Sequence, residues 1–220
     1  MTKDQLYKKV IEYFEKTMPA PETELHYKTP YELMVAVMLS AQCTDVRVNK
    51  ITPAFFEKYP DAESLSKASP QEVFELIKSC SYPNNKAKHL VKAAQMLINE
   101  YGGKLPDNIN DLQKLPGIGR KSANVLVSII YDKPAIAVDT HVFRVANRIG
   151  LANAKTPLGV EKQLSEGFPK ELLPKAHHWL ILHGRYVCKS KNPACDKCGL
   201  TDLCDYYKTS KTKKHVENKS

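Results

Sequence analysis

Long apolar runs are missing from this sequence. The most apolar stretch, residues 33–39, is far shorter than the roughly 20 residues that a helix needs to span a bilayer. The first residues, MTKDQLYKKVIEYF, carry charges throughout and lack the apolar core of a secretory signal. We therefore expect a protein that neither spans a membrane nor enters the export pathway.

Cysteine is scarce and unevenly distributed. Six cysteines in 220 residues are too few for a disulfide scaffold. Cys43 and Cys80 stand alone, and we expect them to be inert core residues. The other four lie between residues 188 and 204, and such clustering in a chain that is not exported favours metal binding over disulfides.

Acidic residues are outnumbered by basic ones. The 24 Asp and Glu face 33 Lys and Arg, so the formal net charge is +9. This excess favours a polyanionic partner but says nothing about the fold. With 42% hydrophobic and 26% charged residues, the composition is that of an ordinary globular protein, long enough for one large domain or two compact lobes.

Sustained alternation of apolar and polar residues, which is typical of strands, is also absent. Apolar residues instead recur every three or four positions, which predicts an all-α fold of about ten short helices. Residues 208–220 are predicted to be a flexible basic extension. The expected helices cover residues 4–17, 30–39, 45–58 (capped by Asp45), 61–67, 70–79, 83–101, 108–115, 121–130, 139–149, 159–166 and 172–183.

Residues 112–121, LQKLPGIGRK, lie between two predicted helices. Pro116 is expected to end the first helix, and Gly117 and Gly119 permit a tight turn because they lack a Cβ. The second helix then begins near Arg120 with unpaired backbone N–H groups, which suit a phosphate. A plain corner between helices explains the glycines equally well, but the order Leu-Pro-Gly-Ile-Gly before basic residues resembles the helix-hairpin-helix motif of DNA-binding proteins.

Lys121 follows in the first turn of that second helix. Most lysines in such positions simply face solvent, and this interpretation stays open. A positive side chain is nevertheless disfavoured there, where Asp or Glu is preferred. A neutral lysine amine is a nucleophile that can form a Schiff base with a sugar C1′, which makes Lys121 a candidate catalytic residue.

Asp139 precedes a predicted helix whose apolar face is Val142, Val145, Ala146 and Ile149. One interpretation is an N-cap, which contributes about 1 kcal/mol. The other is an ionised carboxylate that orients or deprotonates a nucleophile and stabilises positive charge on a sugar. General base catalysis contributes roughly 10²–10⁴ in rate, so the two interpretations can be separated by experiment.

The cysteine cluster has the spacing C-x6-C-x2-C-x5-C, formed by Cys188, Cys195, Cys198 and Cys204. Four thiolates so close in sequence can surround one tetrahedral ion or one iron–sulfur cluster, and the spacing alone leaves zinc and [4Fe–4S] both open. Lys189 and Lys191 lie inside this loop and are candidates for contacts with phosphates.

Taken together, these segments resemble the endonuclease III family of DNA base-excision repair glycosylases. The resemblance extends over about residues 20–206, and its motifs are LSAQCTD, LPGIGRKSANV, AVDTHVFRVANR, HHWLILHGR and the four cysteines, in the family's order. It implies that the cysteines hold a [4Fe–4S] cluster with a structural role. It also implies a six-helix lobe over residues 22–134, with the hairpin motif at about 108–130, and a second lobe formed by residues 1–21 and 135–207.

The same resemblance implies a reaction and a partner. Lys121 takes the position of the Schiff-base nucleophile and Asp139 that of the catalytic carboxylate. The enzyme would remove oxidised pyrimidines from damaged double-stranded DNA and cleave the abasic site by β-elimination, acting as a monomer. It would act in the cytoplasm, at the nucleoid if the source is prokaryotic. The residues expected to contact DNA are Gln42, which would fill the space left by a flipped nucleotide, together with Tyr82, Gly117, Gly119, Arg120, Lys189 and Lys191.

Two positions depart from the family's pattern. Cys80-Ser81-Tyr82-Pro83 replaces the Gly-Leu-Tyr loop of familiar bacterial members, and Cys43 replaces a common Ala beside Gln42. Tyr82 is the candidate wedge in the altered loop, and we expect the contacts to the opposite strand to differ from those of familiar members.

Two other functions stay open at this point. One is a monofunctional adenine or mismatch thymine DNA glycosylase, against which Lys121 argues because such relatives generally lack a lysine there. The other is a non-catalytic DNA-binding module held together by a metal, against which the pair Lys121 and Asp139 argues.

Overall fold

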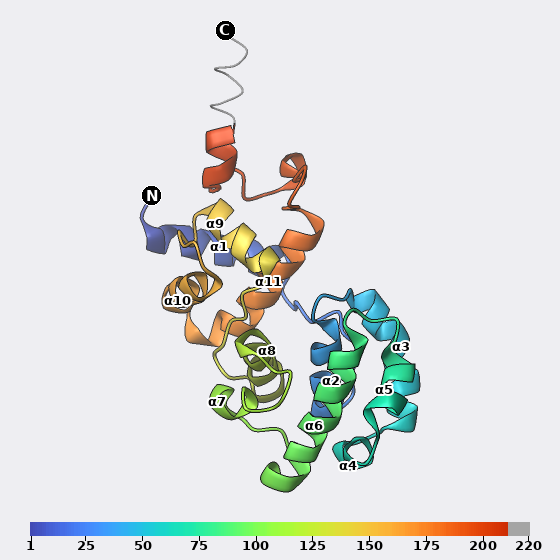
Figure 1. Cartoon of the computed structure of the whole chain (residues 1–220). Helices are drawn as coiled ribbons and strands as arrows, with labels where there is room; N and C mark the ends of the chain where they lie inside the picture. Colours follow the sequence, from blue (N-terminus) through green and yellow to red (C-terminus); the bar gives the residue numbers. More distant parts are fainter. Residues whose placement is uncertain (211–220) are drawn as a thin grey trace. The chain divides into compact units, whose positions relative to one another are not determined.

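The computed structural model of the chain describes residues 1–210, and these contain helices and connecting segments without a strand. This confirms the predicted all-α fold. The chain forms two compact units, Thr23–Asp132, which we call the hairpin unit, and Met1–Glu22 with Lys133–Ser220, which we call the cysteine unit (Figure 1). Residues 211–220 of the predicted basic extension lie outside the described part of the chain, and residues 205–210 are helical.

The hairpin unit is built around α2, which is apolar on all sides. The seven residues from Leu33 to Leu39 are all buried, and α2 packs against α3, α6 and α8. A helix that is apolar all round must lie in a core, so the run of residues 33–39 is the centre of this unit. Its helices are α2 (Pro30–Ser40), α3 (Asp45–Lys58), α4 (Ala62–Ser66), α5 (Pro70–Ile77), α6 (Pro83–Tyr101), α7 (Ile109–Leu112) and α8 (Arg120–Tyr131).

The cysteine unit joins the N-terminal helix to the C-terminal part of the chain. Phe14 stacks on Trp179 with ring centroids 5.6 Å apart, and the Trp179 indole N–H donates to the Met18 carbonyl at 2.7 Å. These aromatic contacts hold helices from opposite ends of the sequence in one core. Its elements are α1 (Lys3–Thr17), α9 (Thr140–Ile149), α10 (Pro157–Gly167), the 3₁₀ turn η1 (Lys170–Leu172), α11 (Leu173–Tyr186) and the 3₁₀ turn η2 (Cys195–Lys197).

Local capping signals explain most helix boundaries. α6 spans its predicted range in full, with Pro83 at its first position and Gly102, at φ 60°, ending it. The prediction that Asp45 caps α3 is wrong, because Thr44 is the N-cap and its hydroxyl accepts a backbone N–H. The helix predicted over residues 108–115 is limited to α7, which ends before the hairpin turn.

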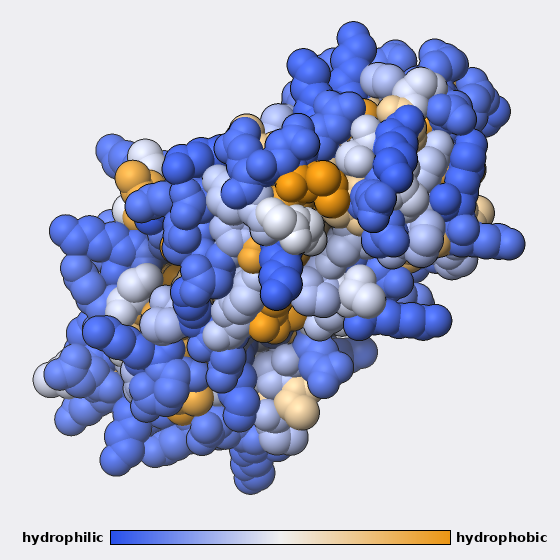
Figure 2. Space-filling model, turned by 90° about the horizontal axis from the view of Figure 1, so that it is seen from below, coloured by the Kyte–Doolittle hydropathy of each residue, from blue (hydrophilic) through white to orange (hydrophobic). Residues whose placement is uncertain are grey.

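One face of the described structure is largely polar. Figure 2 shows hydrophilic side chains over most of one face, with apolar atoms in small separate patches. Within residues 1–210, no helix combines the length and the apolar character that crossing a membrane requires.

Candidate functional site

The hairpin turn depends on one glycine with a left-handed backbone. Gly117 has φ 85°, and a Cβ on it would lie 2.9 Å from His89 Cβ and 3.0 Å from Met38 Cε. Ile118 beside it is buried and anchors the turn in the core. Gly117 is therefore required both by its backbone conformation and by its neighbours.

Gly119 differs from the prediction, because the turn does not need it. It is the N-cap of α8 with an extended backbone, φ −87° and ψ 177°, which any residue can adopt. A Cβ at this position would meet nothing within 4 Å, and no side chain caps the helix at this residue. The missing side chain leaves the N-terminus of α8 open to approach from outside, as an anion-binding helix end requires.

Lys121 lies in this open first turn. It is exposed at the second position of α8, after Arg120, and the first turn of α8 carries no acidic residue. The helix end therefore presents two basic side chains where an acidic one would be favourable in the isolated protein. This arrangement suits a helix that meets an anion from outside.

Gln42 and Tyr82 lie with Gly117 around one open cavity in the hairpin unit. Gln42 has φ 55° and Tyr82 has φ 53°, a left-handed conformation that is uncommon for residues with side chains. Tyr82 is 63% exposed. The structure thus brings together three residues that the sequence predicted to contact DNA, from segments far apart in the chain.

Lys86 fixes the segments around this cavity and was not predicted. Its side chain is buried, and Nζ donates to the carbonyls of Leu39 and Ala41, each at 2.7 Å. The Ser81 hydroxyl donates to the Gln42 carbonyl at 2.7 Å. Burial lowers the pKa of Lys86. The sequence does not predict that Lys86 is buried, because a lysine early in a helix normally faces solvent.

Asp139 caps α9 in the cysteine unit. Its Oδ1 accepts from the backbone N–H groups of His141 and Val142, each at 2.8 Å, and the residue is partly exposed. The segment before it is buried, and its Ala137 carbonyl lies 2.9 Å from His177 Nδ1. The capping interpretation of Asp139 is therefore confirmed, and the cap uses a single carboxylate oxygen.

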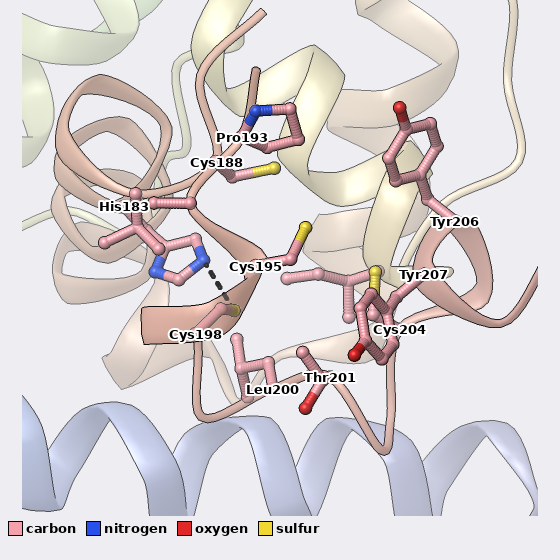
Figure 3. A pocket seen from close by; sticks show the side chains of 13 residues that line it. His183, Cys188, Pro193, Cys195, Cys198, Leu200, Thr201, Cys204, Tyr206 and Tyr207 are labelled. Carbon is pink, nitrogen blue, oxygen red and sulfur yellow. Dashed lines mark hydrogen bonds between the residues drawn. The ribbon is translucent and has the colours of Figure 1, made fainter. Parts of the chain in front are cut away.

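The four clustered cysteines line one small cavity in the cysteine unit, with their sulfur atoms around a common space (Figure 3). Burial raises the pKa of Cys198 and of Cys204. Burial also lowers the pKa of His183 to about 4, and its Nε2 lies 3.5 Å from Cys198 Sγ. Buried thiolates need compensating positive charge, which a metal centre supplies.

Four cysteine thiols can hold either a single ion or a larger group. Within residues 1–210, no three His, Cys, Asp or Glu side chains are placed to hold a metal ion. A zinc ion would require four sulfur atoms about 2.3 Å from one point. Four cysteine sulfurs around one cavity are also a donor set that a polynuclear group can use, because separate irons then bind separate thiolates.

Two arginines of α9 hold the cysteine loop. Arg148 donates to the carbonyls of Lys189 at 2.7 Å and Ser190 at 3.0 Å, and its Nη1 lies 3.5 Å from Cys188 Sγ. Arg144 Nε donates to the Cys188 carbonyl at 3.0 Å. Sequence reasoning missed both arginines, because only the folded chain reveals their carbonyl partners.

Lys189 and Lys191 are exposed on this loop. Lys121 belongs to the hairpin unit, whereas Asp139, the cysteines and these two lysines belong to the cysteine unit.

The chain is similar to known DNA repair proteins over most of its length. Residues 35–170 match the model of the HhH-GPD superfamily base excision DNA repair protein. The endonuclease III of Rickettsia felis is 46% identical over 203 residues, covering 92% of this chain and 95% of that protein.

Solved structures share the fold. A trapped endonuclease III–DNA covalent intermediate, in an estranged-adenine complex, gives a TM-score of 0.90 at 42% identity, covering 96% of this chain and 99% of that chain. A thermostable thymine-DNA glycosylase gives a TM-score of 0.81 at 26% identity, covering 94% and 97%.

Proposed function

The chain belongs to the HhH-GPD superfamily of base excision DNA repair proteins, within its endonuclease III family, and we propose that it excises oxidised pyrimidines through a Schiff base on Lys121. It is a DNA glycosylase and abasic-site lyase that acts on damaged duplex DNA. The observation that carries the assignment of Lys121 is its exposed position in the open first turn of α8, next to the side-chain-free Gly119.

The hairpin binds the DNA backbone in this proposal. Backbone N–H groups at the start of α8 donate to a phosphate oxygen, and the exposed Arg120 side chain supplies a charge-assisted contact. Lys189 and Lys191 supply further phosphate contacts from the cysteine loop. Such contacts release counterions, so affinity falls steeply as salt concentration rises.

The base must leave the stack before C1′ can be attacked. Gln42 then occupies the space left by the extruded nucleotide, and Tyr82 stacks against the opposite strand as a wedge. Their positions on one cavity with Gly117, in strained and therefore defined backbone conformations, support this assignment.

Lys121 performs the covalent step. The lone pair of its neutral amine forms a bond to C1′ while the C1′–N bond to the base breaks, and the base leaves with a proton. Opening of the sugar ring gives an imine between Lys121 and C1′. Removal of a proton from C2′ then expels the 3′ phosphate, which is the β-elimination step.

Asp139 supports this chemistry with its carboxylate. In the proposal it orients or deprotonates the Lys121 amine and stabilises the positive charge that develops on the sugar. Its hydrogen bonds from the backbone N–H groups of His141 and Val142 fix the carboxylate at the start of α9.

Cys188, Cys195, Cys198 and Cys204 would hold a [4Fe–4S] cluster. When bound, the cluster would cross-link the loop and give it a fixed shape. This role is structural, because base excision itself transfers no electrons. Arg144 and Arg148 hold the backbone of the same loop and so present Lys189 and Lys191 to phosphates.

The similarity to a thymine-DNA glycosylase favours one second candidate, a monofunctional glycosylase. Such an enzyme releases the base by water attack and forms no bond to the protein. Lys121 argues against it, and a test for a covalent bond distinguishes the two.

The test is reduction with borohydride during turnover of a duplex that contains an oxidised pyrimidine. We expect a covalent protein–DNA complex with the wild-type protein and none with Lys121→Ala. Lys92→Ala, which removes an exposed lysine of α6 in the same unit, should trap like the wild type. Trapping by Lys121→Ala would contradict the assignment, and base release without trapping by the wild type would establish the monofunctional candidate.

A further inference from the structure

The two cysteines outside the cluster lie against each other. Cys43 Sγ and Cys80 Sγ are 3.8 Å apart, although 37 positions separate them in the sequence. Cys80 is 5% exposed and Cys43 is partly exposed, so Cys43 is not the core residue predicted from the sequence. These are the same two positions at which the chain departs from the endonuclease III pattern.

The pair lies where two functional loops meet. Cys43 follows Gln42, and Cys80 precedes the Ser81-Tyr82 turn. The Ser81 hydroxyl donates to the Gln42 carbonyl at 2.7 Å and lies 3.2 Å from the Ala41 carbonyl oxygen, so hydrogen bonding already joins the two loops. A covalent bond between the sulfurs would therefore connect segments that are already neighbours.

We propose that Cys43 and Cys80 form an oxidation site, at which hydrogen peroxide converts the two thiols into a disulfide that joins the Gln42 loop to the Tyr82 loop. The thiolate of Cys43 attacks one peroxide oxygen, the O–O bond breaks, and a sulfenic acid and hydroxide form. The Cys80 sulfur then attacks the Cys43 sulfur and displaces hydroxide, which leaves as water. In total, two thiols and one peroxide give one disulfide and two waters.

Exposure sets the order of these steps. Cys43 is the more exposed thiol and meets peroxide first. Burial, followed by the neighbouring Cys43 thiol, raises the pKa of Cys80 to about 11, whereas the Lys86 ammonium and the Arg47 guanidinium oppose this shift. Cys80 is thus the protected, resolving partner, and the nearby cations assist loss of its proton during the second step.

Closing the disulfide moves the loops. The sulfurs must approach from 3.8 Å to about 2.05 Å, which displaces the residues on either side, Gln42 and Tyr82 among them. This consequence rests on the proposed function, in which both residues enter the DNA. A shift of about 1 Å in a positioning residue can slow catalysis by up to about 10²-fold, so the oxidised enzyme should react more slowly with damaged DNA.

The first part of the test is chemical and needs no DNA. The full-length holoprotein is treated with hydrogen peroxide, remaining thiols are blocked with N-ethylmaleimide, and the digested peptides are analysed by mass spectrometry. We expect one linked peptide pair containing Cys43 and Cys80, which dithiothreitol separates and which is missing in Cys43→Ser. Recovery of both residues as alkylated thiols, or as separate sulfinic acids, would overturn the pairing.

The second part measures the rate of borohydride trapping before and after peroxide. The rate should fall at least several-fold in the wild type and return with dithiothreitol. In Cys80→Ala, peroxide should leave the rate unchanged. Because this variant keeps the four clustered cysteines, it also controls for damage to the cluster. A mapped disulfide with an unchanged trapping rate would overturn the coupling to DNA. Absence of trapping in the reduced wild type would instead count against the proposed function and leave the chemical result intact.

Discussion

The two units of this chain are held together in different ways. The hairpin unit has a central apolar helix, α2, and its candidate DNA-binding residues are carried on short turns between helices packed around it. The cysteine unit has an aromatic core as well, but residues 187–204 contain little regular structure beyond η2. Arginine side chains hold that loop by donating to its backbone carbonyls, and its four thiols line a cavity. The loops of the hairpin unit thus rest on a packed apolar helix, whereas the cysteine loop is held by polar contacts and, in the proposal, by the cluster.

The largest expected difference between the units follows loss of the cluster. Cys198→Ala should remove the iron and the visible colour, because one of the four proposed ligands is lost. Metal binding contributes on the order of 10 kcal/mol to the stability of the structure around a site. Hydrogen exchange should then accelerate over residues 188–204 while α2 and α8 keep their protection.

Cys80→Ala, which removes a cysteine of the hairpin unit, is the matched control and should keep its iron. Full protection of residues 188–204 in an iron-free Cys198→Ala protein would contradict the account of this loop.

Asp139→Asn separates chemistry from capping in the cysteine unit. Asparagine caps helices as well as aspartate does, so the free energy of unfolding should change by less than about 0.5 kcal/mol. The rate of base excision should nevertheless fall by roughly 10²–10⁴ because the carboxylate charge is lost. Single-turnover kinetics and urea unfolding measure the two effects. An unchanged turnover rate would show that Asp139 only caps the helix and has no catalytic role.

Acid should weaken the cysteine unit before the hairpin unit. His177, His178 and His183 are all buried in the cysteine unit, whereas His26 and His89 of the hairpin unit are exposed. Burial, with a smaller contribution from His177, lowers the pKa of His178 from 6.5 to about 3, so the folded protein holds this ring neutral.

The unfolded chain therefore binds a proton that the folded chain does not, and the contribution of His178 to stability is complete above pH 6.5 and declines towards pH 3. The loss is about 1.4 kcal/mol per pH unit in that window. Urea unfolding followed by fluorescence of Trp179, the single tryptophan, should show a shallower pH dependence in His178→Gln. Equal slopes in the two proteins would contradict this assignment.

The smallest effects concern the two hairpin glycines. Gly117→Ala should destabilise the protein by about 1–2 kcal/mol, because alanine is strained at φ 85° and its Cβ meets His89 and Met38. Gly119→Ser should leave stability equal or a few tenths of a kcal/mol higher, since serine is a good N-cap.

DNA affinity should nevertheless decrease in Gly119→Ser, because the new side chain occupies the approach to the helix end. Fluorescence anisotropy with damaged duplex measures this effect, and tighter binding would show that the open N-terminus is not a phosphate site.

Sequence patterns predicted those features that depend on local chemistry. α6 was predicted in full because Pro83 and Gly102 mark its ends, and α2 because of its apolar run. Positions whose role depends on distant partners were missed: the buried Lys86 binds carbonyls at the end of α2, and Arg148 binds the loop around Cys188.

The two isolated cysteines were misjudged for the same reason. Their contact joins α2's C-terminal loop to the loop before α6, and nothing within either segment indicates the other. The prediction for Gly119 failed for another reason. The sequence shows a glycine but not its backbone conformation, and in the structure the residue leaves open space at the helix end without being needed by the turn.

Identification of the residue that carries the sugar tests the central claim most directly. After borohydride trapping on a duplex with one oxidised pyrimidine, nuclease and protease digestion leaves a peptide with the reduced sugar remnant, which tandem mass spectrometry can locate. The account predicts the remnant on Nζ of Lys121. A remnant on another amine, such as the N-terminus or Lys86, would contradict it.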